Sequence, residues 1–113
     1  MPTTREIPRP HWESYLQEVT DAEVNHLVRL ERDTLAGGSE QLLSGVPLAG
    51  LSLEGKGEFA EAVDITFAPG TPAGDYMHHI DHTRSIYAVE DDDGRLQCLD
   101  IEGDDGKTLV YFD

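Results

Sequence analysis

Basic side chains are scarce in this chain, in which eight Lys and Arg residues face 23 Asp and Glu residues, for a formal net charge of −15. Nucleic acids and anionic membrane surfaces would repel such a domain, so neither is expected as a partner. Lysine is limited to Lys56 and Lys107, and abundant Asp with little Lys is common in proteins of a salt-rich cytosol, where salt screens the repulsion between carboxylates. The same acids also fit a second interpretation, an anionic docking surface for a basic partner.

Cysteine and long apolar runs are also lacking. Cys98 is the single cysteine, which excludes an intrachain disulfide, and its apolar-alternating surroundings predict a buried thiol. No apolar run approaches the ~20 residues of a membrane span, and the chain opens on no secretory leader. We therefore expect a cytoplasmic protein, with a halophilic source as one explanation of its acidity.

The length predicts one domain over residues 1–113, since 113 residues can bury a hydrophobic core without metal or disulfide support. Three segments are expected within it: an extended tail over residues 1–9, a helix over residues 10–20 and a β-rich part over residues 24–112. Pro10 suits the first turn of the helix, where no amide hydrogen is needed. An amphipathic stripe at i, i+3, i+4 and i+7 predicts that the helix docks on a sheet, and it consists of Trp12, Tyr15, Leu16 and Val19.

Beyond residue 22 the patterns are those of strands and tight turns. Period-two alternation predicts a strand near residues 24–30, and Gly37-Gly38 predicts a turn into a short partner at residues 40–43. Further strands are predicted at 48–53, 58–67, 85–90, 95–101 and 108–112, with a loop at 69–74. Asp-Gly dipeptides between the last three strands predict hairpins. The fold class is therefore α+β, with the N-terminal amphipathic helix packed on a mainly antiparallel, meander-type sheet of six to eight strands, either open or barrel-like.

The segment Thr4–Trp12, with its T-R-x-I-P-R-x-x-W pattern, resembles the start of a small bacterial domain family of unknown function. The resemblance extends to a later P-L-x-G element, Pro47–Gly50, and to His79 followed by Thr83-Arg84. His82 stands where such relatives often carry a proline. The resemblance implies no activity, so the function has to be argued from the residues themselves.

Histidines concentrate in the H-H-x-x-H segment formed by His78, His79 and His82, which is flanked by Asp75 and Asp81. These residue types are the usual ligands of zinc, so the three histidines are the candidate metal ligands. In a strand, however, His78 and His79 would point to opposite faces, which favours exposed histidines on a strand edge. A histidine–carboxylate acid–base pair would in addition need a substrate pocket, for which the sequence gives no sign.

Three functions compete on this basis. The first is a non-enzymatic, acidic accessory domain that binds an unknown protein partner or itself, without a cofactor, with Trp12, His79 and Arg84 as candidate interaction residues. The second is an anionic decoy of nucleic-acid-binding proteins, which needs the acids of residues 90–93 and 100–105 on one face. The third is a small-ligand or metal-binding protein that uses the segment His78–Arg84.

Overall fold

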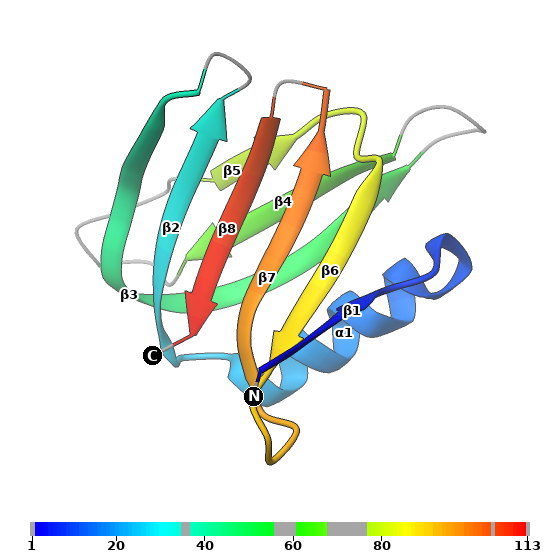
Figure 1. Ribbon diagram of the computed structural model, residues 1–113, viewed down its shortest axis with the longest axis vertical. Coiled ribbons are helices and arrows are strands. Elements are labelled where there is room, and N and C mark those ends of the chain that lie inside the picture. The colour runs from blue at the N-terminus through cyan, green and yellow to red at the C-terminus, as the bar shows by residue number, and fades with distance from the viewer. Residues whose placement is uncertain (1, 35–36, 56–60, 68–76, 105, 113) are drawn as a thin grey trace.

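The computed structural model describes residues 2–34, 37–55, 61–67, 77–104 and 106–112. Within these ranges one helix packs on an eight-stranded sheet (Figure 1). In chain order the elements are β1 (Thr3–Glu6), the 3₁₀ turn η1 (Arg9–His11), α1 (Trp12–Glu23), β2 (Leu27–Thr34), β3 (Ser39–Gly55), β4 (Glu61–Phe67), β5 (Met77–Ile80), β6 (Ser85–Glu90), β7 (Leu96–Gly103) and β8 (Gly106–Phe112). No helix of this part of the chain has the length and apolar character needed to cross a membrane.

The sheet confirms the predicted α+β meander. Its strand order is β1-β6-β7-β8-β2-β3-β4-β5, and every neighbouring pair is antiparallel. Strands β6, β7 and β8 follow one another directly, as the Asp-Gly turns predict, and Gly94 takes the positive φ of +82° that the first of these turns needs. The sheet ends at β1 on one side and β5 on the other, so it curves but is not closed into a barrel.

One long strand, β3, replaces the two short strands expected at residues 40–43 and 48–53. Its first half pairs with β2 and its second half with β4, so this single strand connects the two parts of the curved sheet. Gly45 has a φ of +66°, and the register shifts between Leu48 and Gly50. These irregularities bend the strand without ending it, because bulges change the direction of a strand while pairing continues on either side.

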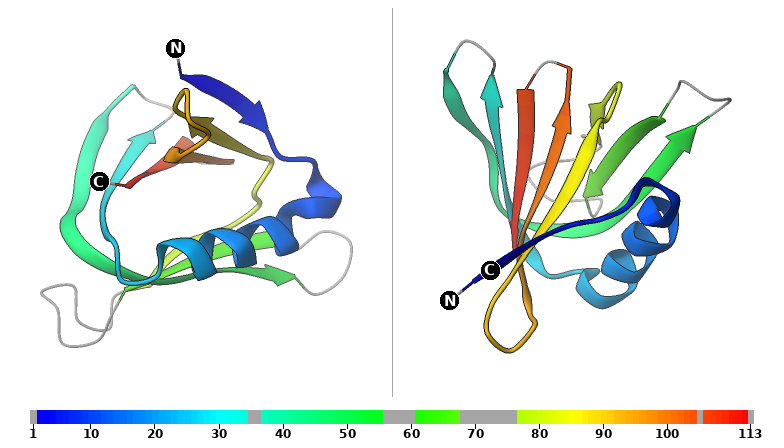
Figure 2. Two further views of the ribbon diagram at one scale, coloured as in Figure 1. Left: turned by 90° about the horizontal axis from the view of Figure 1, so that it is seen from below. Right: turned by 45° about the vertical axis from the view of Figure 1, so that its right-hand side comes forward.

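Helix α1 lies across the concave side of the sheet, as Figure 2 shows. The predicted stripe supplies its buried face, with Trp12, Leu16 and Val19 in the core and Tyr15 packed at its margin. The core partners from the strands are the inward-facing aliphatic residues, which include Leu30, Leu48, Val63, Ile65, Ile86, Leu99, Ile101 and Val110. The apolar face of the helix therefore packs against the apolar inner face of the sheet.

The N-terminal segment is extended, and it joins the sheet as an edge strand. Thr3–Glu6 forms β1 and pairs with β6, and the Ile7 amide donates to the Ile86 carbonyl over 2.8 Å. Pro8 excludes helix at this point, and the extended chain adds to the exposed edge of β6 instead. The helix also runs to Glu23, beyond the predicted end near residues 20–21. Asn25, with a φ of +71°, then turns the chain toward β2.

Strand β4 is buried on both faces, although its sequence alternates. Val63, Ile65 and Phe67 point into the core as expected, yet Ala62 and Asp64 on the other face are also buried. Residues 58–60 of the predicted strand and the predicted loop at 69–74 lie outside the described residues. Asp64 is therefore a buried carboxylate on the outer face of the sheet, where a polar partner is expected.

Candidate functional site

Strand β5 divides the histidines of the H-H-x-x-H segment between two faces of the sheet. Ile65 pairs with His78 and Asp64 pairs with His79 across the β4–β5 ladder. Since Ile65 points into the core, His78 lies on the inner face and His79 on the outer face. The alternation argued from the sequence is therefore confirmed.

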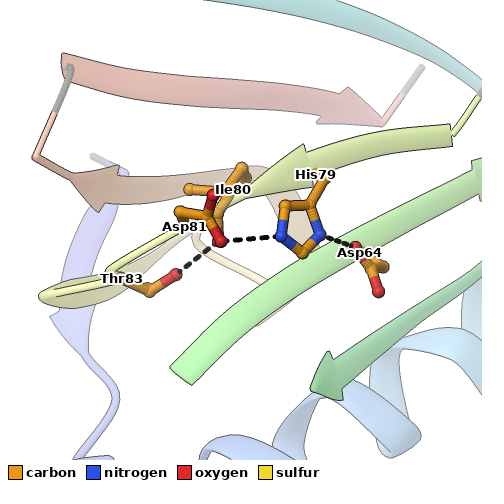
Figure 3. Close-up of polar contacts among 5 residues, drawn as sticks. All are labelled: Asp64, His79, Ile80, Asp81 and Thr83. Carbon is orange, nitrogen blue, oxygen red and sulfur yellow. Dashed lines mark hydrogen bonds and ion pairs between the residues drawn. The ribbon is translucent and has the colours of Figure 1, made fainter. Parts of the chain in front are cut away.

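On the outer face, His79 lies between two carboxylates, as Figure 3 shows. Its Nδ1 makes a short hydrogen bond with Oδ1 of Asp64, which is only 6% exposed, and its Nε2 lies 2.7 Å from Oδ1 of Asp81. The hydrogen bonds to Asp64 and Asp81 raise the pKa of His79, because both favour the charged imidazolium. Neither ring nitrogen is left to accept a proton or a metal, so this arrangement is a clamp between β4, β5 and the following turn.

On the inner face, His78 reaches toward β8 at one end of the sheet. Its Nε2 lies 3.2 Å from the Thr108 hydroxyl. Burial and the charge of nearby Arg32 lower the pKa of His78, which keeps this imidazole neutral at pH 7. These three residues line a cavity of about 200 Å³.

The remaining candidates of this segment do not join either histidine. His82 is exposed in the turn after β5 with a φ of +53°, and Arg84 pairs with Asp104 over 2.7 Å. The three histidines proposed as metal ligands therefore do not converge. Throughout the described ranges, no group of three or more His, Cys, Asp or Glu side chains could hold a metal ion. Asp75 lies outside the described residues.

Trp12, predicted as an interaction residue, is not on the surface. It is 1% exposed, and its Nε1 donates to the Ile7 carbonyl over 2.9 Å. The guanidinium of Arg9 lies 4.5 Å from the centre of the indole ring and donates to the Thr83 carbonyl. The motif residues near the N-terminus thus meet Thr83 in space, which assigns the pattern a role in holding the fold together.

A groove lies between α1 and the β6–β7 hairpin, with a volume of about 480 Å³. Its wall consists of apolar side chains together with polar and charged ones. Its lining residues are Tyr15, Glu18, Val19, Ala22, Glu23, His26, Gly94, Arg95, Leu96, Gln97 and Phe112. We call this cavity the α1–hairpin groove.

Cys98 has the burial expected from its sequence. Burial and neighbouring acids raise the pKa of its thiol to about 11, so at neutral pH it is protonated and a poor nucleophile. This thiol therefore contributes to packing.

Several residues of these sites were not singled out by the sequence. Asp64 follows the alternation of its strand, and only the pairing of β4 with β5 places it under His79. Arg32 and Thr108 are separated by 76 residues and meet because β2 pairs with β8. The α1–hairpin groove likewise joins distant segments, for which the sequence carries no local signal.

Fold and sites together define a small α+β domain in which one amphipathic helix covers an open antiparallel sheet. Comparison with known families matches residues 3–113 to a family of unknown function, DUF5335, and the chain belongs to this family. Neither the curated proteins nor the solved structures provided a match.

Proposed function

We propose that this protein is a non-enzymatic, cytoplasmic interaction domain whose α1–hairpin groove binds a segment of a basic partner protein. The observation that carries this proposal is the groove itself, whose partly apolar wall is built from two different elements. Its volume of about 480 Å³ lies in the range of ligand-binding clefts. The occupied nitrogens of His79 and the protonated thiol of Cys98 support a role in binding over one in catalysis.

Charge indicates which occupant the groove takes. A net charge of −15 makes two copies of this chain repel each other, whereas a basic partner is attracted. Glu18 and Glu23 lie in the wall of the groove, with Arg95 among the lining residues on the hairpin. The occupant that fits is therefore a segment with apolar side chains for the groove and Lys or Arg for the rim.

The anionic-decoy alternative is less well supported. The acids of residues 91–93 lie in the turn before β7, and Asp104 lies in the turn after it (Figure 1). These turns are at opposite ends of an eight-residue strand, roughly 25 Å apart at ~3.3 Å per residue. The acidic turns therefore do not form the compact stripe that a nucleic-acid mimic needs.

The test is fluorescence anisotropy with a labelled amphipathic peptide of Leu and Lys, compared with matched Leu/Glu and Ser/Lys peptides. We expect the Leu/Lys peptide to bind at least about tenfold more tightly than either comparison peptide, since only it supplies both apolar contacts and positive charge. A22W fills the groove and should weaken binding, whereas S44W, at an exposed position of β3, should not.

A charge-reversal pair separates groove binding from general attraction. E18K changes a carboxylate of the groove, and E13K makes the same change at an exposed position of α1 outside it. We expect E18K to weaken binding of the Leu/Lys peptide clearly more than E13K does. Equal effects of the two variants, or equal binding of the Ser/Lys peptide, would show that only the overall field acts and would contradict the proposal.

A further inference from the structure

A second cavity lies at the end of the sheet where β2, β5 and β8 approach one another. It has a volume of about 200 Å³ and is separate in its lining residues from the α1–hairpin groove. Arg32 from β2, His78 from β5 and Thr108 from β8 give it polar walls. These three side chains come from segments far apart in the chain, so the cavity is a product of the tertiary fold.

Arg32 carries a positive charge that no carboxylate of the described residues neutralises directly. This arginine is half-buried, and within the described ranges its guanidinium forms no ion pair, although acids outnumber bases almost three to one in the chain. Its neighbour on β3, Glu40, is paired with it in register but does not come within ion-pairing distance. A half-buried guanidinium without a carboxylate has hydrogen-bond donors available for an anion.

Thr108 and His78 complete the polar wall. Thr108 is buried and is the register partner of Arg32 on the neighbouring strand, so the two side chains share the inner face. The 3.2 Å contact between Thr108 Oγ1 and His78 Nε2 fixes the imidazole beside the same cavity. Asp81 also lines the cavity, but its carboxylate is bonded to the His79 imidazolium, which offsets its negative charge.

We propose that this cavity binds the oxyanion group of a small molecule, a phosphate or a carboxylate, through the guanidinium of Arg32 and the hydroxyl of Thr108. His78 then donates its Nε2–H to Thr108 Oγ1, which leaves the hydroxyl hydrogen of Thr108 for the anion. A guanidinium forms paired N–H···O bonds with both kinds of anion, and such charge-assisted bonds are the stronger ones in proteins. At ~30 Å³ per water, the cavity has the room of about six or seven waters, enough for one such group and a small substituent. This site is independent of the groove and of its proposed occupant.

The test is an NMR titration of the ¹⁵N-labelled protein with inorganic phosphate and, separately, with acetate, at constant ionic strength set by sodium chloride. We expect saturable shifts of the Thr108 amide and of the ring signals of His78. R32Q should lower the affinity at least about tenfold. The matched control R84Q removes the same charge from a side chain that is 72% exposed and outside the cavity, and it should leave the affinity unchanged.

Preference for phosphate would identify a phosphate ester as the ligand class, and preference for acetate a carboxylate. T108V and R32K provide a second line of evidence, because the first removes the hydroxyl and the second keeps the charge but loses the planar fork. Both should bind more weakly than the wild type even where R32Q is too unstable to measure. Shifts that never saturate, or that are the same in the wild type, R32K and T108V, would overturn the proposal.

Discussion

Replacement of Trp12 by Ala tests whether docking of α1 holds the fold together. The indole is 1% exposed, packs in the core and donates one hydrogen bond to the Ile7 carbonyl. Removing a buried ring of this size costs about 3–5 kcal/mol, because the cavity left behind refills only in part. Domains of this size have a total stability of about 5–15 kcal/mol, so the variant should be folded but close to its limit.

Urea unfolding followed by far-UV circular dichroism is the suitable assay, since Trp12 is the single tryptophan and fluorescence would be lost with it. With an m value of about 1–3 kcal/mol per molar, the midpoint should fall by roughly 2 M. W12F keeps most of the apolar volume but loses the N–H donor, so a smaller loss of about 1–2 kcal/mol is expected.

V24A is the matched control, because Val24 is 42% exposed and its truncation should change the stability by less than ~0.5 kcal/mol. A loss under about 1 kcal/mol for W12A would refute the reasoning. It would mean that α1 rests on the sheet without contributing to the core, and that its surface is available to a partner after all.

Three further predictions concern the glycine at position 106 and the titration of His79 and Asp100. G106A should lose about 2 kcal/mol or more in urea unfolding, because Gly106 has a φ of +133° and a Cβ there would collide with the Asp33 carbonyl. For His79, whose pKa is raised by Asp64, the stabilisation is fully present below the ordinary value of 6.5 and is lost as the pH rises through the folded-state pKa. Unfolding free energies measured from pH 6 to 9 should therefore fall more steeply in the wild type than in H79Q, and parallel curves would contradict the clamp. For Asp100, burial and a neighbouring glutamate raise the pKa to about 6, so its charged form opposes folding at pH 7. D100N should raise the free energy of unfolding at pH 7 by about 1 kcal/mol, after allowance for solvent screening at a half-exposed site, and thermal unfolding at that pH measures it. A loss of stability would show that the carboxylate is needed.

Local patterns predicted much of this fold because they depend on residues that are close in the chain. The stripe that begins at Trp12 identified both the helix and its buried face. The Asp-Gly turns identified the β6–β7–β8 meander, since a tight turn leaves the next strand no other neighbour. The same local rule placed His78 and His79 on opposite faces of β5.

Pairings between distant segments could not be obtained in this way. Nothing near Thr3–Glu6 shows that it pairs with β6, more than 80 residues away, and Pro47 and Gly50 read locally as interruptions of what is one strand. Strand pairing depends on which edges are exposed once the rest of the sheet has formed, and that is a property of the whole chain.

The sequence by itself therefore determined the acidic character of the protein, its helix, most of its strands and the faces on which side chains lie. Only the tertiary structure decided which of those side chains meet, Asp64 with His79 and Arg32 with Thr108, and that α1 and the β6–β7 hairpin line one groove. The physical reason is that periodicity specifies direction within one element, whereas a site needs the distance between elements, and packing of the curved sheet under its helix sets that distance.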